Sequence, residues 1–259
     1  MIQSRKYPSD STIFLSIIIL CLSIFMLGCK SDQTPIQQRV GVTEDDIADM
    51  IAASLGSGTS TNGLSAQIGE AATVAGGGSL GKQSRGQTVT APLFDTTIVR
   101  HDTVGDYSYN FTFHYSYEFL NAGNQLNFMF SLHGFYDTPL LSSQDTAASS
   151  LQFTGIVAAD SQYTVNATYS RLGTQTSKVR DHNSFSSALT VTLTNMKVNK
   201  ATKRIQSGAA SITIEGRTPD DIFFSYSATL TILGYQLATL NVNGKTYTID
   251  LASGVATPA

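Results

Sequence analysis

Aromatic residues at every second position make one segment of this sequence a strand candidate. From Tyr107 to Phe119 each odd-numbered residue is Tyr or Phe, and each even-numbered residue is polar. Successive side chains of a strand point to opposite faces, so the segment predicts one aromatic face and one polar face. We interpret the aromatic face as core. The alternative is an exposed platform that stacks on sugar rings, with Tyr107 and Tyr109 the residues most open to that interpretation.

The segment that follows predicts the partner strand and its register. Asn121-Ala-Gly-Asn124 is typical of a turn. Apolar residues then alternate again, at Leu126, Phe128, Phe130 and Leu132. If the four turn residues form the loop, Phe119 pairs with Leu126 and the other apolar partners also fall on one face.

Alternation continues along the chain and predicts a mainly β fold. Further strands are expected at Leu151–Val157, Tyr163–Tyr169, Phe185–Leu193, Ala209–Ile214 and Ile222–Ile232. Asn243-Gly244 fits a two-residue hairpin turn, which would pair Leu240 with Tyr247. Many short strands joined by turns predict an antiparallel meander that forms a sandwich, an open barrel or a large curved sheet.

Two segments before the β region predict a short helical pair. Thr43 is a suitable N-cap, the three acidic residues after it favour the positive end of a helix dipole, and Gly56 supplies a stop. Apolar residues recur at helical spacing in both segments: Ile47, Met50, Ile51 and Leu55, then Leu64, Ile68, Ala72 and Ala75.

The first residues of the chain resemble an export signal. Arg5 and Lys6 precede an apolar run over residues 13–28, which is shorter than the roughly 20 residues that span a bilayer as a helix. Met26-Leu27-Gly28-Cys29 resembles a bacterial lipobox, which implies cleavage between Gly28 and Cys29 and lipid attachment to Cys29. The alternatives are an ordinary secretory signal and an uncleaved anchor.

These segments divide the chain into five parts. They are a signal peptide (1–28), the lipidated Cys29 with a flexible tether (29–42), the helical pair with a glycine-rich linker (43–89), the antiparallel β domain (90–252) and a tail (253–259). Cys21 would leave with the signal and lipid would occupy Cys29, so we expect no free thiol in the folded body. That excludes a cysteine nucleophile, a cysteine-ligated zinc site and an intrachain disulfide.

Charge limits the partners of this chain. Only 14% of the residues are charged, against roughly 25% in a typical soluble domain, so Ser, Thr, Asn and Gln must solvate most of the surface. Removal of Arg5, Lys6 and Asp10 takes away a net +1, so the formal charge of −3 becomes −4. Nucleic-acid binding requires clustered Lys and Arg, and an acidic chain predicts no nucleic-acid partner.

The sequence offers few groups for catalysis or metal binding. Its histidines are His101, His114, His133 and His182. In the predicted register His114 is opposite Ser131 and diagonal from His133, roughly 7–8 Å apart at Cα, with Glu118 the nearest carboxylate on that strand. His114 and His133 are therefore metal-ligand candidates without a third ligand. No residue is assigned to catalysis or to a cofactor, and Asp220-Asp221 beside Pro219 fits a solvated turn.

The chain as a whole resembles uncharacterised β-rich lipoproteins of Bacteroidota, through its lipobox, its helical pair and its Thr-rich meander ending at Leu251. The resemblance implies a lipid-anchored protein. Lys30 stands directly after Cys29, where lipoproteins retained in the inner membrane of enterobacteria usually carry Asp, so we expect the outer membrane, on the periplasmic or the surface face. We expect a non-enzymatic binding or structural module with a protein or glycan partner. The alternative is a hydrolase or carbohydrate-processing enzyme, which needs two carboxylates about 5–9.5 Å apart in a cleft or a histidine-based triad.

Overall fold

The computed structural model describes residues 41–57, 63–78, 80 and 94–259, which belong to one compact unit of the chain. The expected signal segment, the lipobox with Cys29 and nearly all of the tether lie outside the described residues. Within the described residues, neither helix has the length and the apolar character needed to cross a bilayer.

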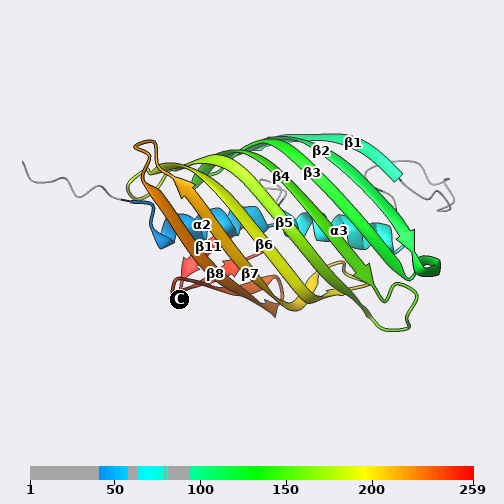
Figure 1. Ribbon diagram of the computed structural model, residues 1–259. Coiled ribbons are helices and arrows are strands. Elements are labelled where there is room, and N and C mark those ends of the chain that lie inside the picture. The colour runs from blue at the N-terminus through cyan, green and yellow to red at the C-terminus, as the bar shows by residue number, and fades with distance from the viewer. Residues whose placement is uncertain (1–40, 58–62, 79, 81–93) are drawn as a thin grey trace, which may run out of the picture. The chain divides into compact units, whose positions relative to one another are not determined.

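One antiparallel sheet forms most of this unit (Figure 1), and 62% of the described residues are in strands. Its eleven strands follow one another in chain order, each hydrogen-bonded to the next. They are β1 (Phe94–Val104), β2 (Tyr107–Leu120), β3 (Gln125–Asp137), β4 (Leu141–Thr154), β5 (Gln162–Ser177), β6 (Ser184–Asn199), β7 (Ile205–Arg217), β8 (Phe223–Gly234), β9 (Leu237–Val242), β10 (Lys245–Asp250) and β11 (Val255–Pro258). Among the described strands, β1 and β11 are edges and the sheet does not close. The predicted mainly β meander is confirmed, in the form of a large curved sheet.

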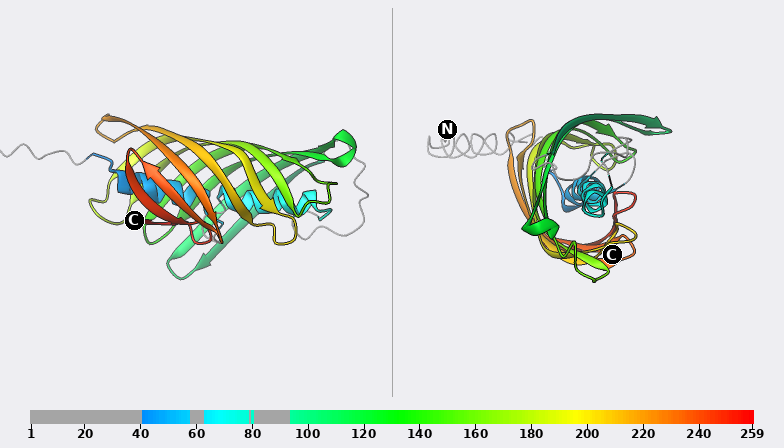
Figure 2. Two further views of the ribbon diagram at one scale, coloured as in Figure 1. Left: turned by 90° about the horizontal axis from the view of Figure 1, so that it is seen from below. Right: turned by 90° about the vertical axis from the view of Figure 1, so that its right-hand side faces the viewer.

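Helices α2 (Glu44–Leu55) and α3 (Leu64–Ala75) lie on the concave side of the sheet, which curves around them (Figure 2). They confirm the predicted helical pair, and Thr43 caps α2 in a capping box with Asp46. Every residue of α2 from Asp46 to Leu55 is buried. A helix buried on all sides belongs to the core of a fold, so α2 is the centre around which the sheet is wrapped.

The predicted register is confirmed at both hairpins. Phe119 lies opposite Leu126 in β2 and β3, and Leu240 lies opposite Tyr247 in β9 and β10. Asn243 and Gly244 have φ of 47° and 96°, as a two-residue hairpin turn requires. Local turn chemistry and the apolar pattern therefore select the same pairing.

The aromatic face of β2 is core at its centre and exposed at its outer end. Phe111, Phe113 and Tyr115 are at most 2% exposed, and the rings of Phe113 and Tyr115 stack with centroids 5.5 Å apart. Tyr109 is partly buried against the core, whereas Tyr107 is 40% exposed. The core interpretation is thus correct for the strand except at Tyr107.

Strands β5, β6 and β7 extend beyond their predicted ranges, and three other strands depart further from the sequence expectation. β1 is an edge strand whose inward side chains are only partly buried, so its alternation is too weak to predict a strand. β4 begins at Leu141 rather than at Leu151. The apolar pattern does not predict its first half, because the inward positions there include Ser143, Asp145 and Ser149 instead of apolar residues. β11 lies within residues 253–259, the expected tail.

Alternate turns of a meander lie at the same end of the sheet, which gives this unit two ends. The near end carries the turns β1–β2, β3–β4, β5–β6, β7–β8 and β9–β10. The start of α2 is also there, because Asn183 in the β5–β6 turn donates a hydrogen bond to Asp46 over 3.0 Å. The far end carries the turns β2–β3, β4–β5, β6–β7, β8–β9 and β10–β11.

Candidate functional site

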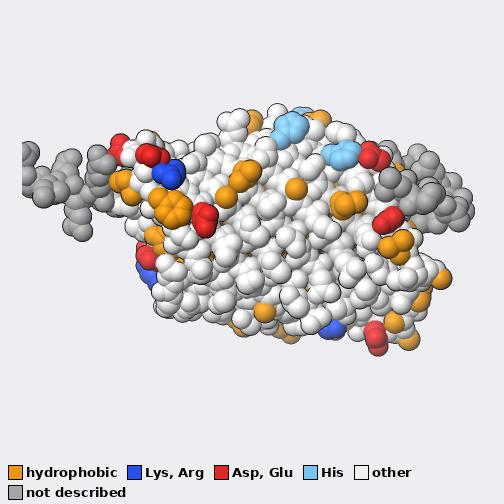
Figure 3. Space-filling model, in the orientation of Figure 1, with side chains coloured by type: hydrophobic (Ala, Val, Ile, Leu, Met, Phe, Trp, Pro, Cys, Tyr) orange, Lys and Arg blue, Asp and Glu red, His pale blue; other side chains and the backbone are white. Residues whose placement is uncertain are grey.

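Short uncharged side chains cover much of the convex face of the sheet. Cross-strand pairing places their hydroxyl and amide groups in rows, one of which contains Ser150, Thr168, Thr192, Ser211, Thr229, Asn241 and Thr246. Figure 3 shows this face as largely white, with few charged side chains. The uncharged polar side chains that the low charged fraction of the sequence predicts are thus gathered on one continuous outer surface.

Two adjoining hollows indent the convex face over β2 to β5. They measure about 420 and 500 Å³ and form one groove, because they share the lining residues His114, Ser131, Ala148 and Ser170. Met129 lines one hollow and Leu172 the other, and both side chains are exposed. The lining contains no Asp, Glu, Lys or Arg among the described residues. We call this hollow the convex groove.

His114 is held at the convex groove by two side chains of β1. Its Nδ1 lies 3.4 Å from Oγ1 of Thr97, and its Nε2 lies 3.3 Å from Oδ2 of Asp95. The imidazole is 50% exposed and the carboxylate 59%, so the pair is solvated and contributes little to stability. A hydroxyl, an imidazole and a carboxylate contact one another in a row here, as in a catalytic triad. Contacts of this length orient the imidazole ring rather than activate the hydroxyl as a nucleophile.

His133 lines the same groove without completing a metal site. It lies opposite Thr112, diagonal from His114 as the register predicts. The expected carboxylate, Glu118, instead accepts a hydrogen bond from Asn127 over 3.1 Å, and Asp95 lies beside His114. In the part of the chain that the structure describes, no three His, Cys, Asp or Glu residues are grouped to hold a metal ion. Sequence reasoning missed Asp95 because it did not predict β1.

A second polar cluster lies in the core between α2 and the sheet. Arg171 of β5 and Asp145 of β4 form a buried ion pair 2.7 Å long. The Arg171 guanidinium also donates to the hydroxyls of Ser143 at 2.7 Å, of Tyr136 at 2.9 Å, and of Ser54 on α2. Burial raises the pKa of Tyr136 to about 12, so its phenol stays neutral beside the ion pair. The cluster therefore fixes α2 to β4 and β5 from inside.

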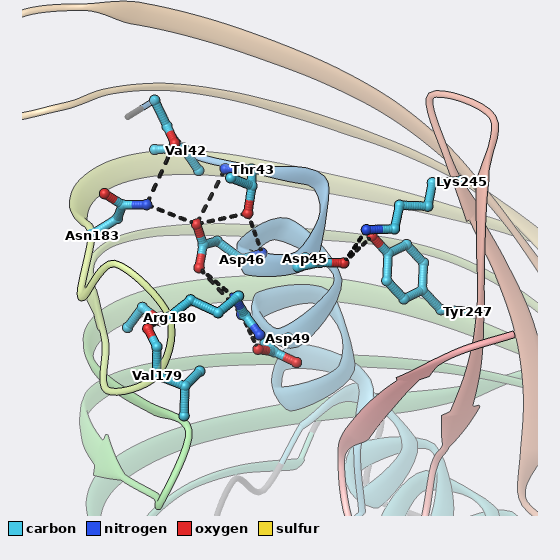
Figure 4. A network of polar contacts seen from close by, with 12 residues as sticks. Val42, Thr43, Asp45, Asp46, Asp49, Val179, Arg180, Asn183, Lys245 and Tyr247 are labelled. Carbon is cyan, nitrogen blue, oxygen red and sulfur yellow. Dashed lines mark hydrogen bonds and ion pairs between the residues drawn. The ribbon is translucent and has the colours of Figure 1, made fainter. Parts of the chain in front are cut away.

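A third network holds the start of α2 at the near end (Figure 4). Arg180 of the β5–β6 turn forms an ion pair with Asp49. Asp45 accepts hydrogen bonds from Lys245 over 2.6 Å and from the hydroxyl of Tyr247 over 2.7 Å. Those hydrogen bonds lower the pKa of Asp45, whereas burial raises the pKa of Asp49. Acidic residues expected to favour the helix dipole thus also bind the helix to the sheet.

The remaining titratable candidates do not converge on one place. His101 is exposed on the edge strand β1, and His182 is exposed in the β5–β6 turn. Asp221 pairs with Arg217 over 2.8 Å in the β7–β8 turn, where both side chains are largely exposed. The convex groove is therefore the place where outward-facing polar groups and a cavity coincide.

Comparison with protein-family models, curated proteins and solved structures found no match for this chain. The fold defines a curved β protein whose helices are enclosed by its own sheet. Its candidate site is an open, uncharged groove on the outer face of that sheet.

Proposed function

We propose that this protein is a lipid-anchored component of the cell envelope that binds a neutral glycan in the convex groove and catalyses no reaction on it. The observation that carries the proposal is the character of the groove. It is a wide, open hollow lined by hydroxyl, imidazole and apolar groups, without a charged side chain among its described lining residues.

The lining suits a ligand that carries many hydroxyl groups. Serine and threonine hydroxyls both donate and accept hydrogen bonds, so they can match sugar hydroxyls in either orientation. Met129 and Leu172 supply apolar contacts at the two hollows for the CH faces of sugar rings. A charged polymer finds no countercharge in such a lining, which favours a neutral glycan over an acidic one.

The placement of the strongly paired charges supports binding rather than catalysis. Arg171 of β5 pairs with Asp145 of β4 on the concave side and also donates to Ser54 of α2. Arg180 pairs with Asp49 of α2. Their charges are used in holding the core together, away from the convex groove. His114 at the groove is solvated, which suits a hydrogen-bonding role better than proton transfer in a water-excluding site.

The anchor is proposed at Cys29 on the basis of the lipobox, with an outer-membrane location on the periplasmic or the surface face. Val42, near the start of the described residues, is held by its carbonyl, which accepts a hydrogen bond from the hydroxyl of Tyr226 over 2.5 Å. Radiolabelled palmitate should be incorporated by the wild-type chain and not by Cys29→Ala. A wild-type chain that takes up no label would contradict the anchor and leave the glycan proposal intact.

Native gels that contain dissolved polysaccharide test glycan binding. We expect neutral glucan, galactan or mannan to retard the wild-type chain, and acidic polygalacturonate to have no such effect. Ser170 lines both hollows of the groove, so Ser170→Arg places a long cation between them and should abolish the retardation. Thr229→Arg adds the same charge on the same face outside the groove, so it is the matched control. Retardation that survives Ser170→Arg, or none with any neutral polymer, would refute the proposal.

A further inference from the structure

Lys and Arg residues without a carboxylate partner gather at one turn of the far end. In the described part of the chain, six cationic side chains form ion pairs with carboxylates: Arg100, Arg171, Lys178, Arg180, Arg217 and Lys245. The four others form none with a described residue, and all lie in or beside the β6–β7 turn: Lys197, Lys200, Lys203 and Arg204. We call Lys197–Arg204 the basic turn.

Carboxylates near the basic turn do not pair with it. Asp160 in the β4–β5 turn is exposed and forms no ion pair among the described residues. Glu118 and Asp250 are also at this end, but Asn127 donates to the first and the amide of Ala252 to the second. Burial and the charge of Lys200 lower the pKa of Lys203. An anion bound at the turn would relieve this repulsion.

Apolar side chains project at the same end. Tyr235, at the tip of the β8–β9 turn, is 99% exposed, and Val157 in the β4–β5 turn is 70% exposed. Leu233 and Leu237 on either side of Tyr235 are exposed as well. Tyr235 has φ of 53°, a region that bulky residues rarely adopt, and such strain is associated with functional positions. Tyrosine is enriched where water meets a bilayer.

Hydrogen bonds join three of the turns at this end. The amide of Val157 donates to Oδ1 of Asn124 over 3.2 Å, which links the β4–β5 and β2–β3 turns. Nζ of Lys200 donates to the carbonyl of Ala158 over 2.7 Å, which links the β6–β7 and β4–β5 turns. We call the β2–β3, β4–β5, β6–β7 and β8–β9 turns together the far rim.

A hollow behind the basic turn has room for an anionic group. It measures about 310 Å³ and is bounded by α3, the basic turn and the β8–β9 turn, with Lys203, Arg204 and Gln236 in its lining. Glu70 also lines it, but this carboxylate is paired with Arg100 over 2.9 Å. The charge and acceptor oxygens of a phosphate group match cationic and amide donors of this kind.

We propose that the far rim docks on the surface of an anionic lipid bilayer. The basic turn faces the headgroups, a lipid phosphate occupies the hollow, and Tyr235 and Val157 insert at the interface. Cations beside exposed apolar side chains are the combination that holds proteins at such a surface, because electrostatic attraction and apolar burial act together. The far rim uses none of the residues that line the convex groove, so this inference is independent of glycan binding.

Vesicle flotation tests the docking with the full chain carrying Cys29→Ala, which cannot bear a lipid. The probes are vesicles of phosphatidylcholine alone and of phosphatidylcholine with phosphatidylglycerol. The apolar run 13–28 is present in every variant, so differences between variants on the anionic vesicles report on the rim. We expect stronger, salt-sensitive binding to the anionic vesicles. Lys203→Gln with Arg204→Gln should weaken it roughly 30-fold, since each cation near an anionic surface contributes about 1 kcal/mol.

Two further variants make the result decisive, with circular dichroism to check that each is folded. Lys178→Gln with Arg217→Gln removes the same charge at the near end and should leave binding unchanged. Val157→Ser with Tyr235→Ser should weaken binding without removing its salt sensitivity. Equal flotation on both kinds of vesicle, or equal effects of the two charge variants, would overturn the proposal. Unchanged binding without the apolar tips would overturn it too, because it would indicate a site for a soluble polyanion.

Discussion

Nη2 of Arg171 lies 2.7 Å from Oδ2 of Asp145, and both side chains are only 3% exposed. The other carboxylate oxygen accepts hydrogen bonds from Ser143 over 2.7 Å and from Gln175 over 3.2 Å. Two opposite charges are therefore held out of water between the central helix and the sheet. Each is tolerated there only because of the other.

Breaking this pair should destabilise the protein more than replacing it. Asp145→Ala is expected to lower the free energy of unfolding by about 3–5 kcal/mol, because it leaves the Arg171 charge buried without compensation. Asp145→Leu combined with Arg171→Leu should lose much less, since no buried charge remains. Urea denaturation measures both. A double variant as unstable as the single one would show that the pair contributes through more than its charges.

Gly173 makes room for the same cluster, so adding one methyl group should be costly. A Cβ at this position would lie 2.0 Å from Oδ1 of Asp145 and 2.6 Å from the carbonyl oxygen of Gln144. We expect Gly173→Ala to lower the free energy of unfolding by about 1–3 kcal/mol. Gly69→Ala in α3 is the control, because its Cβ would meet nothing closer than 3.8 Å and alanine favours a helix. Equal losses of Tm in the two variants would refute the steric argument.

Asp45 and Asp49 should give opposite pH dependences from the same helix. The pKa of Asp45 is lowered in the folded protein, so its stabilising contribution is present at neutral pH and is lost as the pH falls through that pKa. The pKa of Asp49 is raised by burial, so protonation favours the folded state on acidification. Between pH 7 and pH 3, Asp45→Asn should therefore reduce the loss of stability and Asp49→Asn should increase it. Denaturation at both pH values measures the signs, and shifts in the same direction would be inconsistent with these two environments.

The start of α2 should loosen when one hydroxyl group is removed from β8. Tyr226→Phe deletes the hydrogen bond to the carbonyl of Val42 and is expected to cost about 1 kcal/mol. Hydrogen exchange should become faster at the first amides of α2 while the central strands keep their protection. Tyr107→Phe removes a hydroxyl from a more exposed side chain at the near end and is the comparison. Faster exchange throughout the sheet would mean that Tyr226 supports the whole fold rather than the helix start.

Sequence patterns predicted the fold where one face of a strand is apolar and the other polar. The register of β2 with β3 follows from that pattern and one turn. The pattern failed at β1, where edge exposure weakens the contrast between faces, and at Ser143 and Asp145, whose polar side chains face inward. Burial of a polar residue depends on a partner distant in sequence, here Arg171, and no local period reports such a partner.

The candidate site was only partly accessible from sequence. His114 and His133 were placed on one face, but the groove between them depends on four strands aligning small residues such as Ser131 and Ser170 side by side. The basic turn is visible in the sequence as Lys197–Arg204. Its importance does not follow from the acidic net charge of the chain, because net charge does not tell which cations form ion pairs in the folded protein.

The helices at the centre of this fold are synthesised before the strands that enclose them. Asp45 bonds to Lys245, 200 residues later in the chain. At typical rates of synthesis that interval takes about 10–40 s, during which α2 has no native surroundings. Contacts so distant in sequence also slow folding. We therefore expect the growing chain to remain unfolded until its last strands are made, and its core to form in a single late step.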